Sequence, residues 1–441
     1  MTIIQNHQST TVVPAAADKN MREKKITSVA ILGFGTVGRS VAKILCERRT
    51  DGLRLTHIYN RGVARKKVDW VPADVQWTEN IEDVLTAGVD VVVELVGGLN
   101  PAGAWIRRAL ASGKSVVTAN KQLIAHAGPE LMDIATREKQ HIAFGASVAG
   151  GVPVISGLQE GLAGDRLSKI YGILNGTCNY ILSQIENRGI PFSEALAEAQ
   201  TLGYAEADAS DDVDGLDARA KLTILTRIGL RSNVTPEDIA CGTIRIIGAV
   251  DFEYARQLGC TIRQVSWAEL DGDHLYAAVR PALVKLSSPL ARVEGGQNSV
   301  MATGNFGGET VFAGHGAGGN PTAVAVVSDI IAIAGSSSSG SRGFVESPQM
   351  SPSVTADFTT RHYLRFTITD RPGIIAALAK ILSDCDINID SILQKPGYSK
   401  SSLPFVITLE ACKASLVESA LERIAHLDFL VQPTISLPIL D

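Results

Sequence analysis

The sequence has few aromatic residues, no excess of basic charge and no long apolar run. Aromatic residues make up 5% of the 441 residues, and 41 Lys+Arg against 46 Asp+Glu give a net charge of −5. Nucleic-acid-binding surfaces combine a basic footprint with stacking aromatics, so the composition argues against a nucleic-acid partner. No stretch approaches the ~20 apolar residues that a membrane span needs, so we expect no membrane partner either.

Paired cysteines are also missing. The six cysteines are scattered and form no CxxC motif, and a chain of this length needs no disulfides to hold its core. We therefore expect a cytoplasmic protein, with Cys178 as a buried structural residue. Residues 1–25 are polar, with their basic residues after a short apolar patch, which predicts a disordered leader and not a signal peptide.

Glycine is abundant, with 41 residues, and the pattern around it divides the chain into parts. Over 26–150, β-branched strands alternate with helices, which predicts an α/β domain with a Rossmann-type, doubly wound parallel sheet. Residues 151–334 are mixed α+β, and 335–357 are rich in Ser, Gly and Pro, as a flexible linker is. Residues 358–441 follow the order βαββαβ of a ferredoxin-like domain, a candidate regulatory module. The expected helices include 129–139, which would begin at Pro129, and 153–161.

A glycine-rich loop directly follows the first predicted strand, 26–32, and opens a helix. It has the GxGxxG pattern of dinucleotide sites and comprises Gly33, Phe34, Gly35, Thr36, Val37 and Gly38. Such glycines allow a tight turn, close approach of the pyrophosphate and close helix–strand packing, and the helix N-terminus favours the anion. The alternative is a glycine turn without a ligand, which this strand–turn–helix context disfavours.

The end of the second predicted strand, 53–59, bears on the choice of cofactor. NAD sites carry an acid there for the ribose 2′-hydroxyl, whereas residues 59–67 contain four bases and no acid. This favours NADP, with Arg61 as the phosphate partner and Lys66 and Lys67 as weaker candidates. A solvated basic face, with NAD as the cofactor, is the alternative.

The densest chemistry lies in 203–221, where six acids precede one lysine. They are Glu206, Asp208, Asp211, Asp212, Asp214 and Asp217, followed by Lys221. Asp217 and Lys221 are four residues apart and share a helix face. Helix capping by Asp214 and a first-turn Asp217 would explain two of the acids. The whole set suits a substrate with an ammonium group, with carboxylates that hold the amine and a lysine that transfers a proton.

A second lysine, Lys121, stands just past the predicted strand 115–119. Ligands bind at the carboxyl ends of strands in open α/β sheets, so this lysine can reach nicotinamide and substrate together. On its own it would be read as an ordinary solvated residue at a helix start.

At this point the chain resembles the homoserine dehydrogenase family. The matching segments, in the family's order, are GFGTVG, TANK (118–121), ASVAGGVP (146–153), GILNGT (172–177), the stretch 203–221 and GAGGNPTA (316–323). The tail, with Asp370-Arg371-Pro372-Gly373, resembles an ACT domain. The resemblance implies NAD(P)-dependent, reversible interconversion of L-homoserine and L-aspartate 4-semialdehyde, in the biosynthesis of threonine, methionine and isoleucine. It also implies that the middle domain binds substrate and forms a homodimer or higher homo-oligomer, and that the chain rejoins the first domain near 315–334.

The resemblance also implies residue roles. Lys221 is the proton donor and acceptor, Lys121 serves both catalysis and cofactor, and Asp217 supports catalysis and substrate binding. Glu206 and Asp212 complete the amine site, and Gly318 approaches the cofactor. Hydride moves between the nicotinamide and the aldehyde carbon, and the forming alkoxide needs the cation and proton that a lysine offers.

Two further sites follow from the resemblance. Family members bind a monovalent cation, usually sodium, through a glutamate and backbone carbonyls. Here the glutamate position is Gly145, which leaves its own carbonyl and those of Val148, Gly150 and Val152. In the ACT domain, Asp370, Gly373 and Asn388 occupy the places that hold an amino-acid effector such as threonine.

Two other functions fit parts of the sequence. One is a non-catalytic amino-acid sensor that binds the dinucleotide and couples it to an ACT ligand. The presence of Lys121, Glu206, Asp217 and Lys221 argues against it, because a binding protein needs no proton-transfer lysine. The other is a dehydrogenase for a different amino-acid aldehyde.

Overall fold

The amino-terminal strands form a parallel six-stranded sheet in the order β3-β2-β1-β4-β5-β6. The computed structural model describes residues 26–48, 52–336 and 350–440, so the predicted leader, 1–25, lies outside the described residues. The strands are β1 (Thr27–Leu32), β2 (Leu53–Tyr59), β3 (Gln76–Thr78), β4 (Val91–Glu94), β5 (Ser115–Thr118) and β6 (Ile142–Ala143). This is the strand order of dinucleotide-binding Rossmann domains, and it confirms the predicted fold class.

Both faces of this sheet are buried, as the apolar strands predict. On β1, Val29 and Ile31 point to one cluster of core residues, and Ala30 and Leu32 point to the other. The helices of this part are α1 (Thr36–Arg48), α2 (Val63–Lys66), α3 (Glu82–Leu85), α4 (Ala102–Ala111) and α5 (Lys121–Arg137). Alternate side chains therefore anchor helices on opposite faces.

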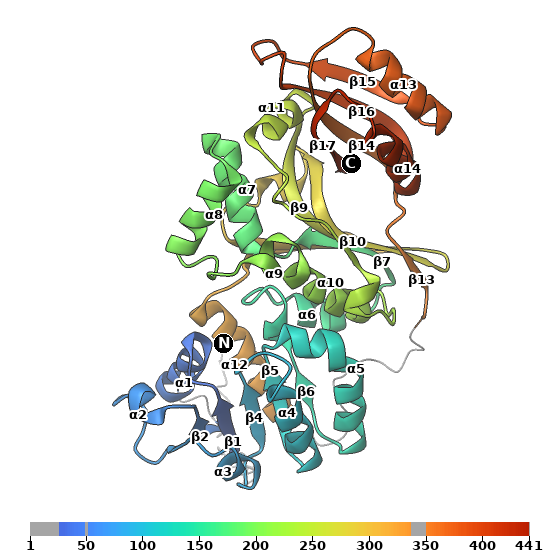
Figure 1. Cartoon of the computed structure of the whole chain (residues 1–441). Helices are drawn as coiled ribbons and strands as arrows, with labels where there is room; N and C mark the ends of the chain where they lie inside the picture. Colours follow the sequence, from blue (N-terminus) through green and yellow to red (C-terminus); the bar gives the residue numbers. More distant parts are fainter. Residues whose placement is uncertain (1–25, 49–51, 337–349, 441) are drawn as a thin grey trace, which may run out of the picture.

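One of the helices on this sheet comes from much later in the chain. Helix α12 (Gly319–Gly335) inserts Ala323, Val326 and Ile330 into the same core cluster as Val29 and Ile31. In Figure 1 it lies beside α1 and β5. The chain thus returns to the first sheet after building the middle of the molecule.

Helix α5 differs from its prediction. The sequence suggested a helix from Pro129, whereas α5 begins at Lys121 and contains Pro129 in its interior. Asn120 caps the true start, because its side chain accepts a hydrogen bond from the backbone N–H of Leu123 at 3.1 Å. The predicted helix 153–161 is also different: α6 (Val154–Ser156) continues as a π-helical turn over Gly157–Gly161.

The middle of the chain contributes long antiparallel strands to a second sheet. These are β7 (Leu167–Ile173), β9 (Cys260–Asp271), β10 (His274–Lys285), β11 (Gln297–Gly304) and β12 (Gly308–His315), with short β8 (Ala240–Cys241) beside β10. The helices are α7 (Gly176–Arg188), α8 (Phe192–Thr201), α9 (Ser210–Val213), α10 (Leu216–Gly229) and α11 (Ala249–Gln257). Single 3₁₀ turns lie at Gly145–Ser147, Pro236–Asp238 and Pro289–Arg292. Figure 1 shows α10 between the two sheets, close to the start of α5.

The carboxy-terminal elements have the predicted βαββαβ order. They are β14 (Thr359–Ile368), α13 (Ile374–Asp384), β15 (Ile389–Gln394), β16 (Leu403–Lys413), α14 (Ala414–Ile424) and β17 (Leu430–Leu440). All neighbouring strands pair antiparallel, in the order β17-β14-β16-β15. This confirms the ferredoxin-like architecture.

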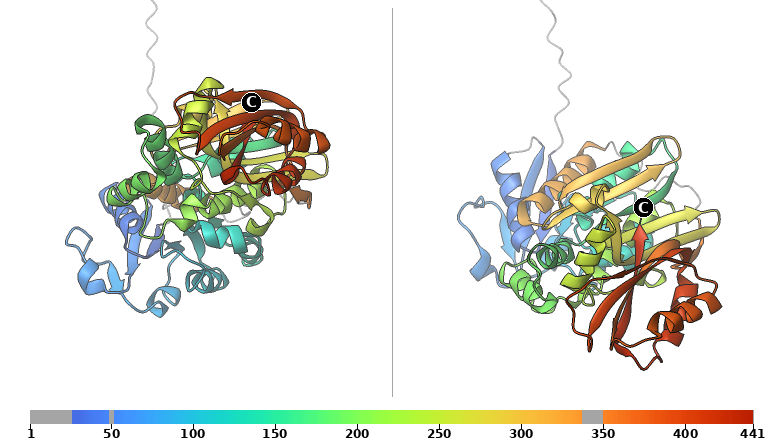
Figure 2. Two further views of the ribbon diagram at one scale, coloured as in Figure 1. Left: turned by 45° about the horizontal axis from the view of Figure 1, so that its top comes forward. Right: turned by 90° about the horizontal axis from the view of Figure 1, so that it is seen from above.

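The tail is joined to the middle of the molecule more closely than a tethered module would be. Strand β17 pairs with β10, so the two sets of strands form one sheet of 11 strands. In the views of Figure 2 the red tail lies against the yellow central strands. Within the predicted linker, β13 (Ser353–Thr355) pairs with β10, and residues 337–349 lie outside the described residues.

Candidate active site

The site begins at the glycine-rich loop between β1 and α1. Gly33 has φ +101°, and a Cβ there would meet the Leu95 carbonyl oxygen at 2.8 Å. A Cβ on Gly38 would lie 2.0 Å from the Gly33 carbonyl oxygen, whereas a Cβ on Gly35 would meet nothing within 4 Å. Two glycines are therefore required for packing, and the third leaves open space above the loop, where a pyrophosphate can approach.

One later glycine segment, at Gly319, contacts the start of α1, and a second, at Gly150, contacts that segment. A Cβ on Gly319 would lie 3.0 Å from the hydroxyl of Ser40, and that hydroxyl donates a hydrogen bond to Asn320 at 2.9 Å. Gly150 lies closer still to Gly316, whose carbonyl oxygen would be 2.6 Å from an added Cβ. The N-cap of α12 is Gly318, with φ +120°. Gly318 thus lies one residue from the contact with α1, although the chain separates it widely from the loop.

The basic residues predicted for a 2′-phosphate lie at the end of β2. Arg61 follows Asn60, and it is exposed. Asn60, for which no role was predicted, connects the end of β2 to the glycine-rich loop. Its side-chain oxygen accepts a hydrogen bond from the Phe34 backbone N–H at 3.1 Å. The signal for this residue was its position, where an acid or its amide ends the second strand of a Rossmann fold.

The loops after β4 and β5 are held together by a buried carboxylate. Glu94 is fully buried and accepts hydrogen bonds from the backbone N–H groups of Val96 and Gly97, at 2.7 and 2.9 Å. It also accepts one from the Thr118 hydroxyl at 2.6 Å, and that hydroxyl accepts the backbone N–H of Asn120 at 3.0 Å. This network positions the start of α5, and therefore Lys121, at the carboxyl edge of the sheet.

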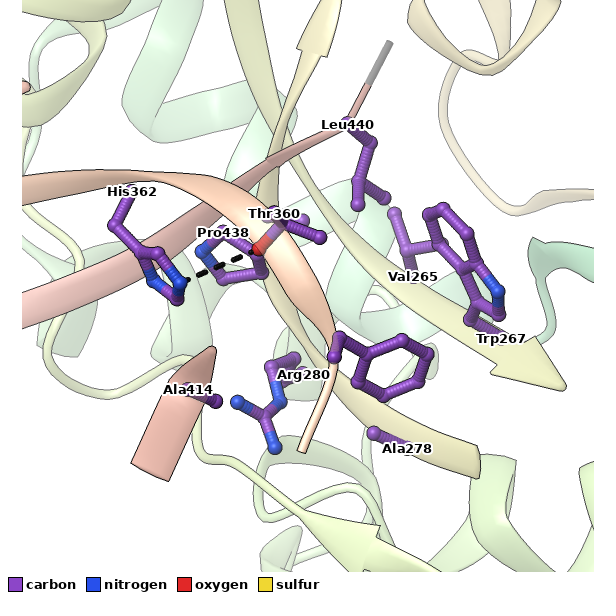
Figure 3. Close-up of a pocket in the computed structure, with 11 residues that line it drawn as sticks. Val265, Trp267, Ala278, Arg280, Thr360, His362, Ala414, Pro438 and Leu440 are labelled. Atoms are coloured by element: carbon purple, nitrogen blue, oxygen red, sulfur yellow. Dashed lines mark hydrogen bonds between the residues drawn. The ribbon is translucent and has the colours of Figure 1, made fainter. Parts of the chain in front are cut away.

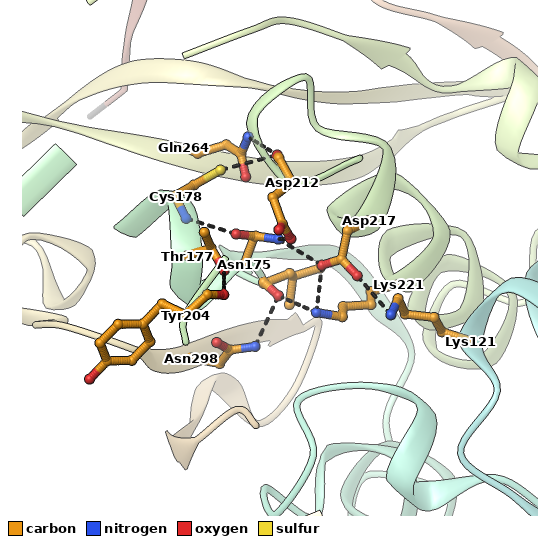
Figure 4. Close-up of polar contacts among 11 residues, drawn as sticks. Lys121, Asn175, Thr177, Cys178, Tyr204, Asp212, Asp217, Lys221, Gln264 and Asn298 are labelled. Carbon is orange, nitrogen blue, oxygen red and sulfur yellow. Dashed lines mark hydrogen bonds and ion pairs between the residues drawn. The ribbon is translucent and has the colours of Figure 1, made fainter. Parts of the chain in front are cut away.

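Both predicted lysines bind the same carboxylate (Figure 4). The Nζ of Lys221 is 2.7 Å from Oδ2 of Asp217, and the Nζ of Lys121 is 3.0 Å from Oδ1. Lys221 also donates to the Leu174 carbonyl oxygen at 2.8 Å. Asp217 and Lys221 share a face of α10, whereas Lys121 comes from α5. The structure therefore brings these three residues together as one group.

Asn175 completes what we call the acid–lysine cluster: Lys121, Asn175, Asp212, Asp217 and Lys221. Its side-chain N–H groups donate to Asp217 at 2.8 Å and to Asp212 at 2.7 Å, while its oxygen caps α7 by accepting the Cys178 N–H at 2.8 Å. The GILNGT segment contains this asparagine, but the sequence analysis assigned it no role. Strand β7 was not predicted, so the position of Asn175 between a strand and a helix was not recognised.

The charged groups of the cluster shift one another's pKa values. Burial alone would raise the pKa of Asp217, but the charges of Lys221 and Lys121 outweigh it and hold the pKa well below its usual range. The charge of Asp217 in turn raises the pKa of Lys121. Burial raises the pKa of Asp212, and the neighbouring Asp217 adds to that rise. An approaching ammonium group would relieve the repulsion between these two carboxylates.

The remaining acids of 203–221 lie elsewhere. Asp214 binds Arg245 and Thr243, and the N-cap of α10 is Gly215, so the capping explanation for Asp214 is wrong. Asp208 caps the turn at Ser210. Glu206 and Asp211 are exposed, and among the described residues no side chain is hydrogen-bonded or ion-paired to the Glu206 carboxylate. Cys178 is fully buried, as expected of a structural cysteine.

Gly145 lies against the carboxylate of Asp329, which no sequence motif indicated. Its backbone N–H donates to Oδ2 of Asp329, on α12, at 2.8 Å, and a Cβ at this position would be 2.8 Å from Oδ1. Burial raises the pKa of Asp329 to about 7. Asp329 fills the space that a side chain at position 145 would need. Within the described residues there is no group of three or more His, Cys, Asp or Glu side chains that could hold a metal ion.

A Rossmann sheet with a glycine loop at its switch point and an acid–lysine cluster at its carboxyl edge defines an α/β dehydrogenase. Similarity to known proteins identifies the family of dehydrogenases to which the chain belongs. Residues 33–145 match the model "Homoserine dehydrogenase, NAD binding domain", residues 153–331 match "Homoserine dehydrogenase" and residues 362–428 match "ACT domain".

Relatives and solved structures agree. The chain is 38% identical to a homoserine dehydrogenase of Synechocystis, over 91% of this chain and 96% of that one. The crystal structure of a homoserine dehydrogenase from Thiobacillus denitrificans has a TM-score of 0.85 at 32% identity, over 95% and 99% of the two chains. A hyperthermophilic archaeal homoserine dehydrogenase in complex with NADPH has a TM-score of 0.60 at 29% identity, over 69% and 96%. The chain belongs to the homoserine dehydrogenase family and is an NAD(P)-dependent oxidoreductase with an ACT domain. In the described part of the chain, no helix is long and apolar enough to cross a membrane.

Proposed function

We propose that this chain interconverts L-homoserine and L-aspartate 4-semialdehyde at the acid–lysine cluster. The observation that carries the proposal is a single buried carboxylate, Asp217, bound to two lysines from different helices. The cluster lies at the carboxyl edge of a dinucleotide-binding sheet, where substrate and nicotinamide must meet. Bound NAD(P) supplies or accepts the hydride at the substrate carbon.

Lys221 is the proton donor and acceptor in this proposal. An ammonium group has three N–H donors, and two of those on Lys221 are directed to Asp217 and Leu174. The third has no partner among the described residues, so it is available to the substrate oxygen. When hydride reaches the aldehyde carbon, the forming alkoxide takes its proton from this lysine; oxidation reverses the transfer.

Lys121 and the acids perform binding and charge stabilisation. The neighbouring Asp217 keeps Lys121 protonated, so its positive charge favours the alkoxide and lies beside the cofactor. Asp212, with Asp217, is suited to the substrate ammonium. The charge of Asp217 raises the pKa of Asp212, and a positive group between the two carboxylates would offset this repulsion. The free carboxylate of Glu206 is the third partner of the amine in this proposal.

The test of the catalytic assignment is Lys221→Ala. We expect loss of aspartate-semialdehyde-dependent NADPH oxidation by about 10²–10⁴-fold, with cofactor binding retained. A matched control is Lys380→Ala, since Lys380 is also paired with an aspartate four residues away, Asp384, but is exposed. Near-full activity of Lys221→Ala would refute the assignment, and a wild type that binds cofactor without turnover would instead favour the sensor. A larger amino-acid aldehyde that outcompetes the semialdehyde would favour the other dehydrogenase.

NADP is the proposed cofactor, with Arg61 at the 2′-phosphate. The basic end of β2 and the NADPH in the archaeal relative support it. We expect Arg61→Ala to reduce the ratio of kcat/KM for NADPH to that for NADH by about tenfold or more. Arg54→Ala, at the opposite end of β2 in an exposed ion pair, is the matched control. An unchanged ratio in Arg61→Ala would leave NAD as the alternative.

The sodium ion of the family fits this chain poorly. At Gly145 the expected glutamate is missing, and Asp329 fills the space its side chain would need. The backbone carbonyls of Gly145, Val148, Gly150 and Val152 are all that remains of the predicted set. We derive no catalytic step through a cation.

Regulation is the second part of the proposal: the ACT domain binds an amino-acid effector such as threonine. Gly373, with φ +93°, forms the turn before α13, and the side chain of Asn388 donates to Glu410 at 3.2 Å. Asp370 follows the end of β14. A threonine titration should inhibit the wild type and not Asn388→Ala; a flat response in both removes this part. The same proposal includes a homodimer or higher homo-oligomer, which light scattering tests, and a cytoplasmic location.

A further inference from the structure

A pocket lies between the ACT elements and the central strands, away from the acid–lysine cluster. Figure 3 shows the side chains that line it. Strands β9 and β10 contribute Val265, Trp267, Ala278, Arg280 and Ala282, and the carboxy-terminal elements contribute Phe358, Thr360, His362, Ala414, Pro438 and Leu440. The hollow is open to solvent, and the about 380 Å³ of space between its atoms includes this open mouth.

The sheet register explains why one charged group enters this apolar pocket. Ala278 pairs with Trp267, and Arg280 pairs with Val265, so these four side chains share one face of the β9–β10 ladder. The neighbouring Val279 points to the other face, where it lies 3.2 Å from where a Cβ on Gly215 would be, at the start of α10. The pocket and the catalytic helix therefore lie on opposite sides of the same strand.

Arg280 has no partner for its guanidinium within the described residues. No described side chain or carbonyl accepts a hydrogen bond from it or forms an ion pair with it. Burial lowers the pKa of Arg280, against the opposing charge of Glu418 on α14. Glu418 is exposed and does not line the pocket. The guanidinium nitrogens remain reachable from solvent, so their N–H donors are available to a ligand that accepts hydrogen bonds.

From this charge and these walls, we propose that the pocket binds a small monocarboxylate with a short apolar chain, for which 4-methylpentanoate is the probe. The carboxylate would accept the paired N–H donors of Arg280, a geometry that guanidinium groups favour. Val265, Trp267, Phe358 and Leu440 would cover the chain of the ligand.

The lining also decides against two related ligands. No acid lines the pocket, so the ammonium of an α-amino acid would be buried without a counter-charge. A phosphate needs several cations or backbone N–H donors, and here there is one arginine. The first N–H groups of α14 are already used, since Ala414 donates to the Phe358 carbonyl oxygen and Ser415 to Asp357. The site is therefore distinct in place and in ligand from the amino-acid site expected at Asp370, Gly373 and Asn388.

The test uses the full chain and isothermal titration with 4-methylpentanoate. We expect saturable binding of one ligand per chain, and binding at least about tenfold weaker for the neutral isostere 4-methylpentanamide and for leucine, its 2-amino derivative. Arg280→Gln should weaken binding of 4-methylpentanoate by about 10- to 100-fold. Binding is measured without turnover, so its failure leaves the Lys221→Ala result untouched.

A second pair of variants separates loss of the site from loss of the fold. Ala414→Phe fills the pocket from α14 and should abolish binding, whereas Ser415→Phe, one residue along on the exposed side, should not. Circular dichroism and homoserine oxidation should be the same in both. The proposal is wrong if 4-methylpentanoate does not bind at millimolar concentration, if the amide or leucine binds equally well, or if binding survives in both Arg280→Gln and Ala414→Phe.

Discussion

Lys121 and Asp217 lie on different helices, α5 and α10, yet their charged groups are 3.0 Å apart. Lys121 begins the helix that follows the fifth strand of the Rossmann sheet, and Asp217 lies in the first turn of the helix that carries Lys221. This contact joins the cofactor-binding part of the chain to the proposed proton-transfer lysine.

Asp217→Asn should lower kcat/KM by about 10²–10³-fold, because it removes the charge that orders both lysines. It should also move the alkaline limb of the pH profile. The charge of Asp217 raises the pKa of Lys121, so its removal lets that pKa fall and Lys121 loses its proton at a lower pH. Asp214→Asn, which affects an exposed pair with Arg245, is the control. An alkaline limb that does not move would contradict the role of Lys121.

Thr118→Val should disturb Lys121 from a distance. The hydroxyl of Thr118 donates to the buried Glu94 and accepts from Asn120, and valine has the same shape without either bond. We expect a loss of about 1–3 kcal/mol in the free energy of unfolding, with a fall in kcat/KM. Thr86→Val, at an exposed helix end, should change neither. Urea denaturation and initial rates with NADPH measure both effects, and wild-type values for Thr118→Val would show that this network does not position Lys121.

Asp251→Asn tests how firmly the tail is attached. Asp251 is fully buried on α11 and accepts hydrogen bonds from Arg365 at 2.6 Å and Tyr363 at 2.9 Å, both on β14. Removing the carboxylate leaves a buried arginine unpaired, which should cost about 3–5 kcal/mol.

The control for this variant is Asp390→Asn, which breaks the pair between Arg361 and Asp390. Both side chains are 37% exposed, so we expect less than about 1 kcal/mol. Hydrogen exchange of β14 should increase in Asp251→Asn and not in the control. Equal protection in both would mean that other contacts, such as the pairing of β17 with β10 and the Lys395–Glu253 ion pair, hold the tail.

His362 should make the stability depend on pH. Burial lowers the pKa of His362 from 6.5 to about 4, and the charge of Arg280 lowers it further. In the unfolded chain the ring takes up its proton near pH 6.5, whereas the folded chain resists it until about pH 4, so stability falls as the pH drops through this window. The full effect is about 3 kcal/mol. His362→Gln should flatten the dependence of the unfolding free energy between pH 7 and 4, and a slope equal to that of the wild type would refute the assignment.

Much of the fold could be read from local patterns. Alternating strands and helices predicted the parallel sheet, and the GxGxxG loop indicated its dinucleotide site, because both depend on residues that are neighbours in the chain. The start of α5 was misplaced because Pro129 looked like a helix start, while the capping bond of Asn120 was overlooked. Strand β12 was not predicted because apolar and polar residues do not alternate along it.

Some features of the candidate site could likewise be predicted from the sequence, and others could not. The sequence by itself determined that a lysine follows a strand end and that an acid and a lysine share one helix face, since strand direction and the helical repeat require it. Only the tertiary structure decided that Lys121 reaches Asp217, that Asp329 fills the space beside Gly145, and that β17 joins β10. These contacts depend on how sheets and helices pack over long separations in the chain. Packing of this kind is set by the combined burial of many side chains, and no short segment contains it.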